Sequence, residues 1–306
     1  MEENNRIYEY VSASNPLMPK IPVLTHSYKL HQEGKTRIIP FDLSSKLKSN
    51  YPLTGPNLLV SFIRIKKNED ITFSSKASSN AFYIIKGSGI CSVKEENDIN
   101  WNKGDLFVLP YFNNFYFKSL EKDCSIYWYN DEPLMNYLKV IPYEPSFKPS
   151  FFKNEIMLKE VEKIKNSNNS KEKNRTGILL GNKMTDYMNL GGSGTLTLTP
   201  TLWSLLNVLP SNTIQKPHRH NSIALDLCVF SSDSKKVYTE MGPELDNNGK
   251  VKDPIKCYWE TGSVFITPPG WWHSHHNETN EDAWVLPAQD AGLYTYQRTL
   301  DIQFSV

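Results

Sequence analysis

The sequence lacks a dominant charge. Its 306 residues include 34 Lys and Arg against 33 Asp and Glu, which leaves a formal net charge of +1. No block of like charges marks an acidic or basic tail. Proteins that bind nucleic acid carry a basic patch or stripe. We therefore expect no nucleic-acid partner.

Targeting and membrane segments are also missing from the pattern. Residues 1–6 are polar and acidic, whereas a signal peptide begins with basic and then apolar residues. No uninterrupted apolar segment has the length needed to span a bilayer. The few cysteines lie far apart without a Cys-x-x-Cys motif, which favours buried free thiols in a reducing compartment. We expect a cytoplasmic protein without membrane contact, in which these thiols are Cys91, Cys124, Cys228 and Cys257.

Prolines and aromatic residues are abundant, by contrast. The 19 prolines and the aromatic content of 12% favour strands and turns over a helical bundle. From residue 58 onward, short β-rich segments such as 59–65 and 81–85 alternate with Gly, Asn and Asp turns, as in a sandwich or barrel. A glycine and a proline recur at the same spacing in 104–110 and 262–268. This repeat predicts an all-β chain with a duplicated β-module.

The boundaries of these modules follow from changes in pattern. A proline-containing arm comes first, and a connector with apolar residues at helical spacing over 155–164 separates the two β-modules. The connector also contains a solvated loop at 166–170. Its Gly-Gly-Ser-Gly run at 191–194 lacks the following helix and Lys-Ser/Thr of a phosphate-binding loop, so we interpret it as a hinge. The expected parts are an arm at 1–50, a first module at 51–130, the connector at 131–195 and a second module at 196–306.

A pattern of histidines in the second module predicts a metal site. Five of the seven histidines lie in this half of the chain. His218 and His220 are two residues apart and would share one face of a strand. His273 follows a stiff corner formed by two prolines and a glycine at 268–270. Neutral imidazoles bind Zn, Cu, Fe and Ni, so three of them from two strands could hold one ion. The alternative is a set of unrelated surface histidines.

These motifs resemble a known family. The pattern Gly262-x5-Pro268-x-Gly270-x2-His273-x3-Asn277 matches the second motif of the cupins, and residues 217–220 resemble the start of the first. Cupins are double-stranded β-helix barrels of the jelly-roll kind. Over about 215–280 the sequence looks most like the gentisate 1,2-dioxygenase group of bicupins. The resemblance implies two tandem cupin barrels.

The same resemblance implies a cofactor and an activity. Members of this group bind Fe(II) through three histidines and cleave the ring of a hydroxylated aromatic acid with O2. His218, His220 and His273 carry over as the iron ligands. The general cupin motif has a Glu where this chain has Ala224 and Leu225. A three-histidine site without that Glu leaves more open positions for substrate and O2. Another divalent metal such as Mn, Zn or Ni is the alternative.

Two features depart from the group. Gentisate-type enzymes generally have an Arg after the Ala-Leu pair, but this chain has Asp226. If the strand runs unbroken from His220, Asp226 points inward. Its role is left open between substrate contact, orientation of a ligand histidine and an ion pair with Arg298. The group also typically keeps its metal site in the N-terminal barrel, whereas the motif here is in the C-terminal one.

The first module has no histidine after His31. Phe115 stands at the position that matches His273, and residues 78–80 (Ser-Ser-Asn) occupy the region of the His-x-His. We therefore predict that this barrel lacks metal ligands. Its expected role is structural, in packing, in dimerisation or in covering the second barrel.

Further residues near the motif are candidates for catalysis. His275 and His276 could carry protons near the metal, or lie at the surface or behind the ligands. Tyr238 and His275 are candidate bases, together with Asp226. A pocket for an aromatic substrate could be lined by aromatic side chains of the second module, for which core packing is the alternative: Trp271, Trp272, Tyr238 and Trp259.

Three functions remain at this point. The first is a mononuclear non-haem Fe(II) dioxygenase of the gentisate 1,2-dioxygenase type, which acts on a small hydroxylated aromatic compound with O2. The second is a non-oxidative metal-dependent enzyme of the same fold, such as a lyase, isomerase or hydrolase. The third is a non-enzymatic, storage-like bicupin that binds a small molecule. A homo-oligomer is expected by analogy with other bicupins.

Overall fold

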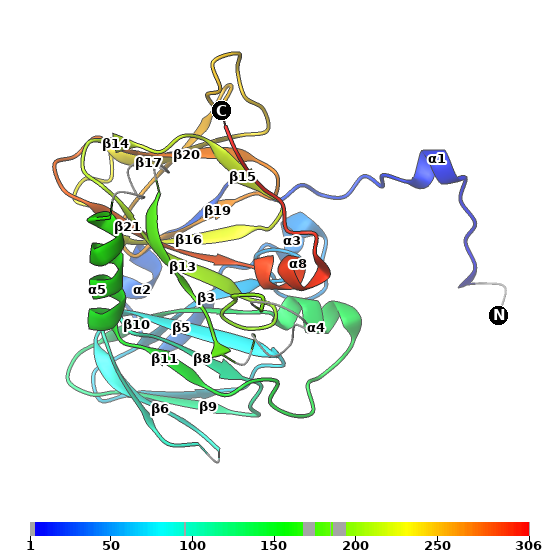
Figure 1. Cartoon of the computed structure of the whole chain (residues 1–306). Coiled ribbons are helices and arrows are strands. Elements are labelled where there is room, and N and C mark those ends of the chain that lie inside the picture. The colour runs from blue at the N-terminus through cyan, green and yellow to red at the C-terminus, as the bar shows by residue number, and fades with distance from the viewer. Residues whose placement is uncertain (1–3, 95, 168–174, 184, 186–193, 306) are drawn as a thin grey trace.

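A computed structural model describes residues 4–94, 96–167, 175–183, 185 and 194–305. The chain forms four antiparallel sheets that stack in layers, with short helices at their edges (Figure 1). Two sheets belong to each of two barrels, so the predicted all-β, two-barrel architecture is confirmed. The helices are α1 (Tyr10–Ala13), α2 (Lys29–Gln32), α3 (Ser44–Leu47), α4 (Glu132–Leu138), α5 (Asn154–Lys165) and α8 (Ala291–Gln297).

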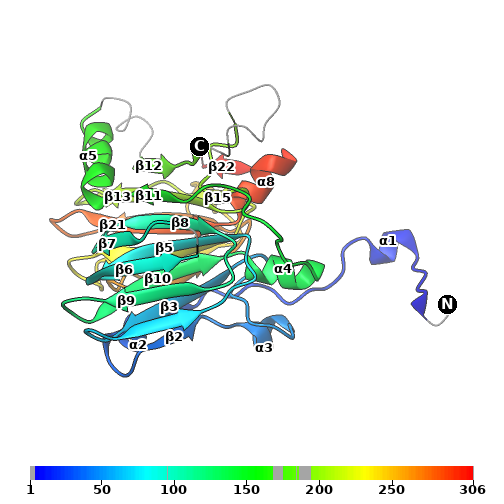
Figure 2. The same cartoon turned by 90° about the horizontal axis from the view of Figure 1, so that it is seen from below.

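The first barrel has a six-stranded sheet in the order β11-β8-β5-β10-β3-β2 and a four-stranded sheet in the order β4-β9-β6-β7. Figure 2 shows the strands of the six-stranded sheet side by side. The strand bounds are β2 (Arg37–Pro40), β3 (Leu59–Ile65), β4 (Asp70–Phe73), β5 (Ser79–Lys86), β6 (Ser88–Val93), β7 (Ile99–Asn102), β8 (Leu106–Pro110), β9 (Phe115–Ser119), β10 (Cys124–Asn130) and β11 (Ser150–Phe152).

The second barrel has a six-stranded sheet in the order β1-β19-β16-β21-β13-β12. Its outer sheet has the order β18-β17-β20-β15-β22, with β14 paired to β20. The bounds are β1 (Thr25–His26), β12 (Thr176–Leu180), β13 (Trp203–Leu209), β14 (Thr213–Ile214), β15 (His218–His220), β16 (Ala224–Phe230), β17 (Val237–Gly242), β18 (Ile255–Tyr258), β19 (Val264–Thr267), β20 (Trp272–Asn277), β21 (Ala283–Gln289) and β22 (Ile302–Phe304).

The two six-stranded sheets pack against each other. Side chains alternate across a strand, and alternate residues of β10 serve two cores. Tyr127 and Tyr129 point into a core shared by both barrels, while Ile126 and Trp128 point into the first barrel. The Tyr127 hydroxyl donates a hydrogen bond to the Leu225 carbonyl at 2.8 Å, across the junction. The barrels therefore share one continuous hydrophobic core.

The arm and the connector each contribute strands to both barrels. In the arm, β1 pairs with β19 of the second barrel and β2 with β3 of the first. In the connector, β11 pairs with β8, α5 packs Met157 and Val161 into the shared core, and β12 pairs with β13. Helix α5 confirms the helix expected at 155–164. Of the expected loop and hinge, residues 168–170 and 191–193 lie outside the described residues.

Aromatic rings fill the first barrel where the second holds histidines. Phe115 takes its predicted place at the start of β9 and is fully buried. Phe82 lies between its neighbours, with ring centroids 5.0 Å from Phe117 and 5.9 Å from Trp128. Within the described part of the chain, the one group of side chains able to hold a metal lies in the second barrel. The first barrel thus has a core packed with aromatic rings.

Two other predictions concern single features. The four cysteines are buried free thiols, as expected. Among the helices that the structure describes, none combines the length and the apolar character needed to cross a bilayer.

Candidate metal centre

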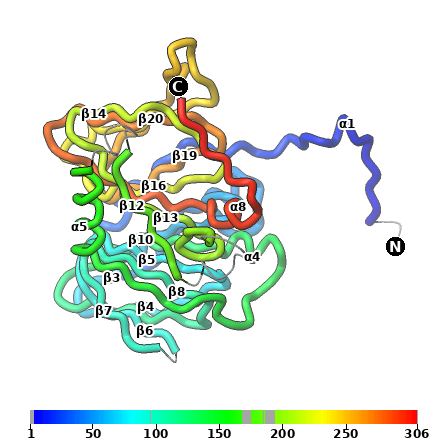
Figure 3. Tube along the Cα trace, in the orientation of Figure 1, coloured from blue at the N-terminus to red at the C-terminus, as the bar shows by residue number. Residues whose placement is uncertain are grey.

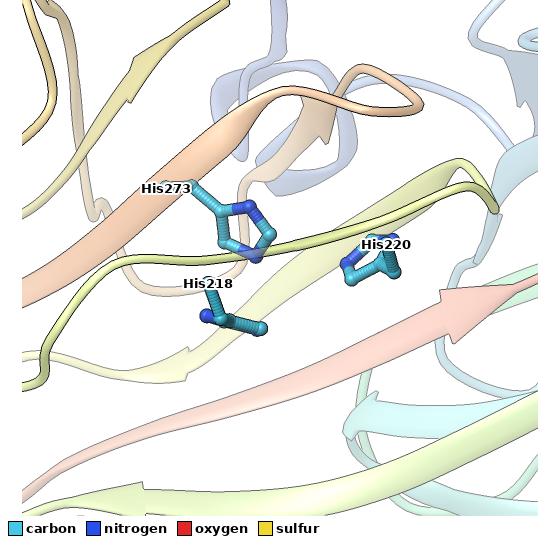
Figure 4. A group of neighbouring side chains, drawn as sticks. All are labelled: His218, His220 and His273. Carbon is cyan, nitrogen blue, oxygen red and sulfur yellow. The ribbon is translucent and has the colours of Figure 1, made fainter. Parts of the chain in front are cut away.

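Three histidines converge on the inner face of the outer sheet in the second barrel (Figure 4). His218 and His220 point inward from β15, and His273 comes from the neighbouring strand β20. His218 and His273 are paired in register, which places their side chains side by side. One nitrogen from each of the three rings falls within 4.8 Å of the others. The sequence predicted this group from two strands, and the structure shows that these strands, β15 and β20, are neighbours within one sheet.

The proline-glycine corner fixes the start of β20. Gly270 has φ +75°, a conformation that favours glycine. Its N–H donates to the His220 carbonyl at 2.7 Å, and the Trp271 N–H donates to the Pro268 carbonyl at 3.2 Å. The corner is therefore bonded directly to the strand that carries the other two histidines.

Backbone carbonyls orient two of the rings. Nδ1 of His220 lies 2.8 Å from the Ser222 carbonyl, and Nδ1 of His273 lies 3.0 Å from the Trp271 carbonyl. Because a carbonyl can only accept, each Nδ1 carries the proton and each Nε2 keeps a free lone pair. Burial lowers the pKa of His220 to about 4 and holds that of His273 well below its usual range. Both rings are neutral near pH 7, as ligation requires.

His218 has a different partner. Its Nδ1 lies 2.8 Å from Nη2 of Arg175, which also donates to the Lys216 carbonyl at 2.7 Å. The guanidinium of Arg175 lies over the Phe304 ring, 5.8 Å from its centroid. Burial lowers the pKa of Arg175 to about 10, so it remains a cation at neutral pH. Sequence reasoning missed Arg175, because it comes from the connector and no motif marks it.

A cavity of about 200 Å³ lies between the two sheets of the second barrel and contains the three histidines. The six-stranded sheet supplies one wall through alternate residues of β13 and through β16 and β21. Arg175 and β22 complete the lining. Besides His218, His220 and His273, it comprises Arg175, Trp203, Leu205, Asn207, Gln215, Ala224, Asp226, His275, Pro287, Gln289, Ile302 and Phe304.

Asp226 reaches this cavity by a route that differs from the expected one. The strand is interrupted at residues 221–223, where the chain crosses from the outer sheet into β16 of the six-stranded sheet. Asp226 lines the cavity, and its carboxylate accepts a hydrogen bond from the Thr267 hydroxyl at 2.6 Å. Burial raises the pKa of Asp226 to about 7, and the Thr267 bond opposes that rise.

Two of the three roles considered for Asp226 do not match these contacts. The ion pair with Arg298 is wrong: Arg298 caps α8, its guanidinium donates to the Tyr296 carbonyl and it lies over the Tyr296 ring. The three histidines are oriented by carbonyls and by Arg175. Contact with a molecule in the cavity is the role that the position of Asp226 favours.

The other two candidate bases lie on opposite faces of the outer sheet. His275 lines the cavity, and its Nδ1 is 2.9 Å from the Thr239 hydroxyl, which accepts from Nε1 of Trp259 at 2.9 Å. Since Thr239 faces inward, Tyr238 must face outward. Its ring stacks on His276 and its hydroxyl donates to Glu278 at 2.8 Å. Tyr238 therefore points away from the cavity, on the face of β17 opposite to Thr239. The prediction that Tyr238 acts at the site is wrong.

The aromatic lining also differs from the candidates. Trp203 and Phe304 line the cavity. Trp259 is fully buried in the core beside it, and the Trp272 ring stacks under Arg219, whose guanidinium lies 5.0 Å from the ring centroid. The residues named from the sequence were close along the chain, whereas Trp203 and Phe304 approach from distant strands.

The donor set fits a divalent transition metal. Three neutral imidazoles are borderline-soft nitrogen ligands, which suit Zn, Fe, Ni and Cu. Ala224 lines the cavity at the position where a Glu would extend toward them, and its methyl group offers no ligand atom. An ion held by His218, His220 and His273 would therefore keep open positions toward the cavity.

No protein-family model and no curated protein matches the sequence. Solved structures do match over nearly the whole chain. A salicylate 1,2-dioxygenase from Pseudaminobacter salicylatoxidans is 14% identical, with a TM-score of 0.74, and the match covers 99% of this chain and 94% of that one. The adducts of that enzyme with gentisate give 14% identity and a TM-score of 0.71, over 99% and 91%.

A plant globulin shares the fold as well. Procruciferin, an 11S globulin from Brassica napus, is 11% identical with a TM-score of 0.58, over 94% of this chain and 87% of that one. At these identities the likeness concerns the fold. The chain therefore has the two-barrel cupin fold of the salicylate 1,2-dioxygenase structures, with a three-histidine group inside its second barrel.

Proposed function

We propose that the protein is a mononuclear non-haem Fe(II) dioxygenase of the gentisate 1,2-dioxygenase type, which cleaves the ring of a small hydroxylated aromatic compound with O2. The observation that carries this proposal is the group of three neutral histidines whose open side faces a cavity between the two sheets of the second barrel. The fold shared with salicylate 1,2-dioxygenase supports it.

The size and lining of the cavity support a substrate with a single ring. An apolar cavity of about 150 Å³ is enough to hold benzene, so about 200 Å³ suits one substituted ring. Trp203 and Phe304 offer flat apolar surfaces to it. Arg175 and Asp226 offer polar groups, which suit hydroxyl or acidic substituents.

The chain's own residues would bind and orient this substrate. An Fe(II) ion at the three histidines would supply the redox chemistry with O2. Asp226 is placed to accept a hydrogen bond, or a proton, from a substrate hydroxyl, because its pKa of about 7 lies near the operating pH of a general base. His275 presents a neutral ring to the same space, and Leu205 and Pro287 add apolar surface to its lining.

The pKa of Asp226 also favours a second candidate, a non-oxidative enzyme in which Zn, Mn or Ni polarises the substrate and Asp226 acts as the base. A small-molecule-binding bicupin without turnover is the third candidate. The cupin fold alone does not distinguish these three candidates, since procruciferin has the same fold.

Metal analysis and oxygen uptake separate the candidates. We expect anaerobically purified protein to contain about one iron per chain, as one three-histidine site predicts. Addition of gentisate, salicylate or a catechol should then start oxygen consumption in an electrode cell. Turnover of a substrate without oxygen consumption would favour the non-oxidative enzyme, and binding without turnover would favour the third candidate.

We further propose that the arm at residues 4–20 binds a second copy of the chain. This first segment of the arm extends away from both barrels (Figure 3), whereas the later part with β1 and β2 packs on them. Ile7 on it is 97% exposed, and further large apolar side chains are exposed nearby. A cluster of this kind is typical of an interaction site. The exposed residues are Ile7, Tyr8, Tyr10, Val11, Leu17 and Met18.

Deletion of residues 1–20 should lower the mass of the assembly in solution. Strands β1 and β2 remain in the shortened chain, so both barrels should stay folded. Sedimentation of the full and shortened chains measures the mass directly. A full-length variant with Ile7, Val11 and Leu17 changed to Ser is the matched control and should behave like the deletion. If the assemblies of all three chains contain the same number of subunits, the arm has no role in assembly.

A further inference from the structure

The partner of His218 sets it apart from the other two ligands. His220 and His273 each donate from Nδ1 to a carbonyl oxygen, which leaves Nε2 free to bind a metal. Nδ1 of His218 faces Nη2 of Arg175 at 2.8 Å. A guanidinium has donors and no acceptor. Nδ1 of His218 must therefore accept, and the proton of the neutral ring is on Nε2.

In this arrangement neither nitrogen of His218 can bind a metal. Nδ1 uses its lone pair for Arg175, and Nε2 carries a proton. Ligation through Nδ1 requires Arg175 to leave. Ligation through Nε2 requires the proton to be on Nδ1, where it would face the Nη2 donor, so Arg175 must leave in this case too. The Arg175–His218 hydrogen bond and metal ligation by His218 exclude each other.

The fold holds Arg175 at this position. Thr176 begins β12, which pairs with β13 from Thr176 opposite Val208 onward. Nη2 of Arg175 is bonded to the Lys216 carbonyl as well as to His218. Strand pairing therefore holds the chain directly after Arg175 and at His218, and release of His218 requires the Arg175 side chain to move away.

We propose that Arg175 is a positioning residue that competes with the metal for His218 and thereby sets the affinity and the rate of metal binding. The inference rests on the three-histidine metal centre, and it holds for any divalent ion that the centre binds. The positive charge of Arg175 at the cavity adds to the competition, because it repels a divalent cation.

Zinc binding to chelator-treated protein tests this competition. In Arg175→Met, competition with a chromophoric chelator should show about ten- to hundredfold tighter zinc binding, which is the size of effect that partners of ligand histidines have. Zinc should also associate faster in stopped flow. Arg219→Met is the matched control, since Arg219 lies between His218 and His220 but contacts Gln303 and Trp272 on the outer face. It should bind zinc within about twofold of the unmodified protein, well short of the change in Arg175→Met.

A measurement on the unmodified protein keeps the test independent of the variants. Long-range ¹H–¹⁵N NMR of the imidazoles should show the Nε2–H tautomer for His218, and Nδ1–H for His220 and His273, before zinc is added. Equal zinc affinity in Arg175→Met and the unmodified protein, or equal tightening in both variants, would overturn the role of Arg175. Failure of all proteins to bind zinc would overturn the metal centre and this inference with it.

Discussion

Replacement of His273 by Ala is expected to abolish metal binding while both barrels remain folded. His273 is paired in register with His218, and two imidazoles would remain at the site after its removal. Changes to the partners of ligand histidines alone weaken metal binding about 10- to 100-fold. Loss of a ligand should therefore weaken it by more than about 100-fold. Metal content after purification and zinc competition measure the loss.

The fold should tolerate His273→Ala, because the truncated side chain borders a cavity and the strand keeps its pairing with β17 through Met241 opposite residue 273. Circular dichroism checks this. The control is His276→Ala, on the same strand but on the outer face, where His276 lies 3.4 Å from Glu240. That variant should keep its metal. Full metal content in His273→Ala would show that the ligand assignment is wrong.

The grouping of the three histidines was predictable because local rules place them. Alternation along a strand puts His218 and His220 on one face, and the corner at 268–270 brings His273 into register. No such rule placed Tyr238, because the phase of β17 relative to the cavity depends on its pairing with β20 and cannot be read from its own residues.

The rest of the site depends on contacts between distant segments. Arg175 lies 43 residues before His218 along the chain and reaches it only because β12 pairs with β13. Trp203 from β13 and Phe304 from β22 line the same cavity. Neither periodicity nor spacing in one sequence contains such contacts. The inward position of Asp226 was predicted, although from an unbroken strand that the structure divides at 221–223.

Asp226→Asn is expected to stabilise the chelator-treated protein at pH 8. Burial raises the pKa of Asp226 from 3.8 to about 7, so the folded chain binds more protons than the unfolded chain between these values. The folded chain favours the protonated carboxyl of Asp226. The stability that this protonated form gives is therefore fully present below about pH 4 and is lost as the pH rises to about 7. A shift of this size corresponds to about 4 kcal/mol. An amide has no such penalty and can still accept the bond from Thr267.

Urea unfolding at several pH values measures this effect. The free energy of unfolding of the unmodified protein should fall between pH 4 and pH 7 by more than that of Asp226→Asn. In Thr267→Val, loss of the hydroxyl that lowers the pKa of Asp226 should extend the fall to higher pH. If Asp226→Asn is less stable than the unmodified protein at pH 8, the carboxylate has a stabilising partner and the expectation is wrong.

The same substitution should weaken substrate binding or slow turnover, because an amide cannot take a proton from a substrate hydroxyl. A gain in stability together with a loss in turnover is the combination that distinguishes a residue kept for its chemistry from one kept for the fold. A residue kept for the fold would show a loss of stability with normal kinetics. Asp226 is buried at the cavity wall with the Thr267 hydroxyl as its hydrogen-bond donor. A carboxylate placed there costs folding free energy at neutral pH, and contact with a molecule in the cavity is the function that would offset this cost.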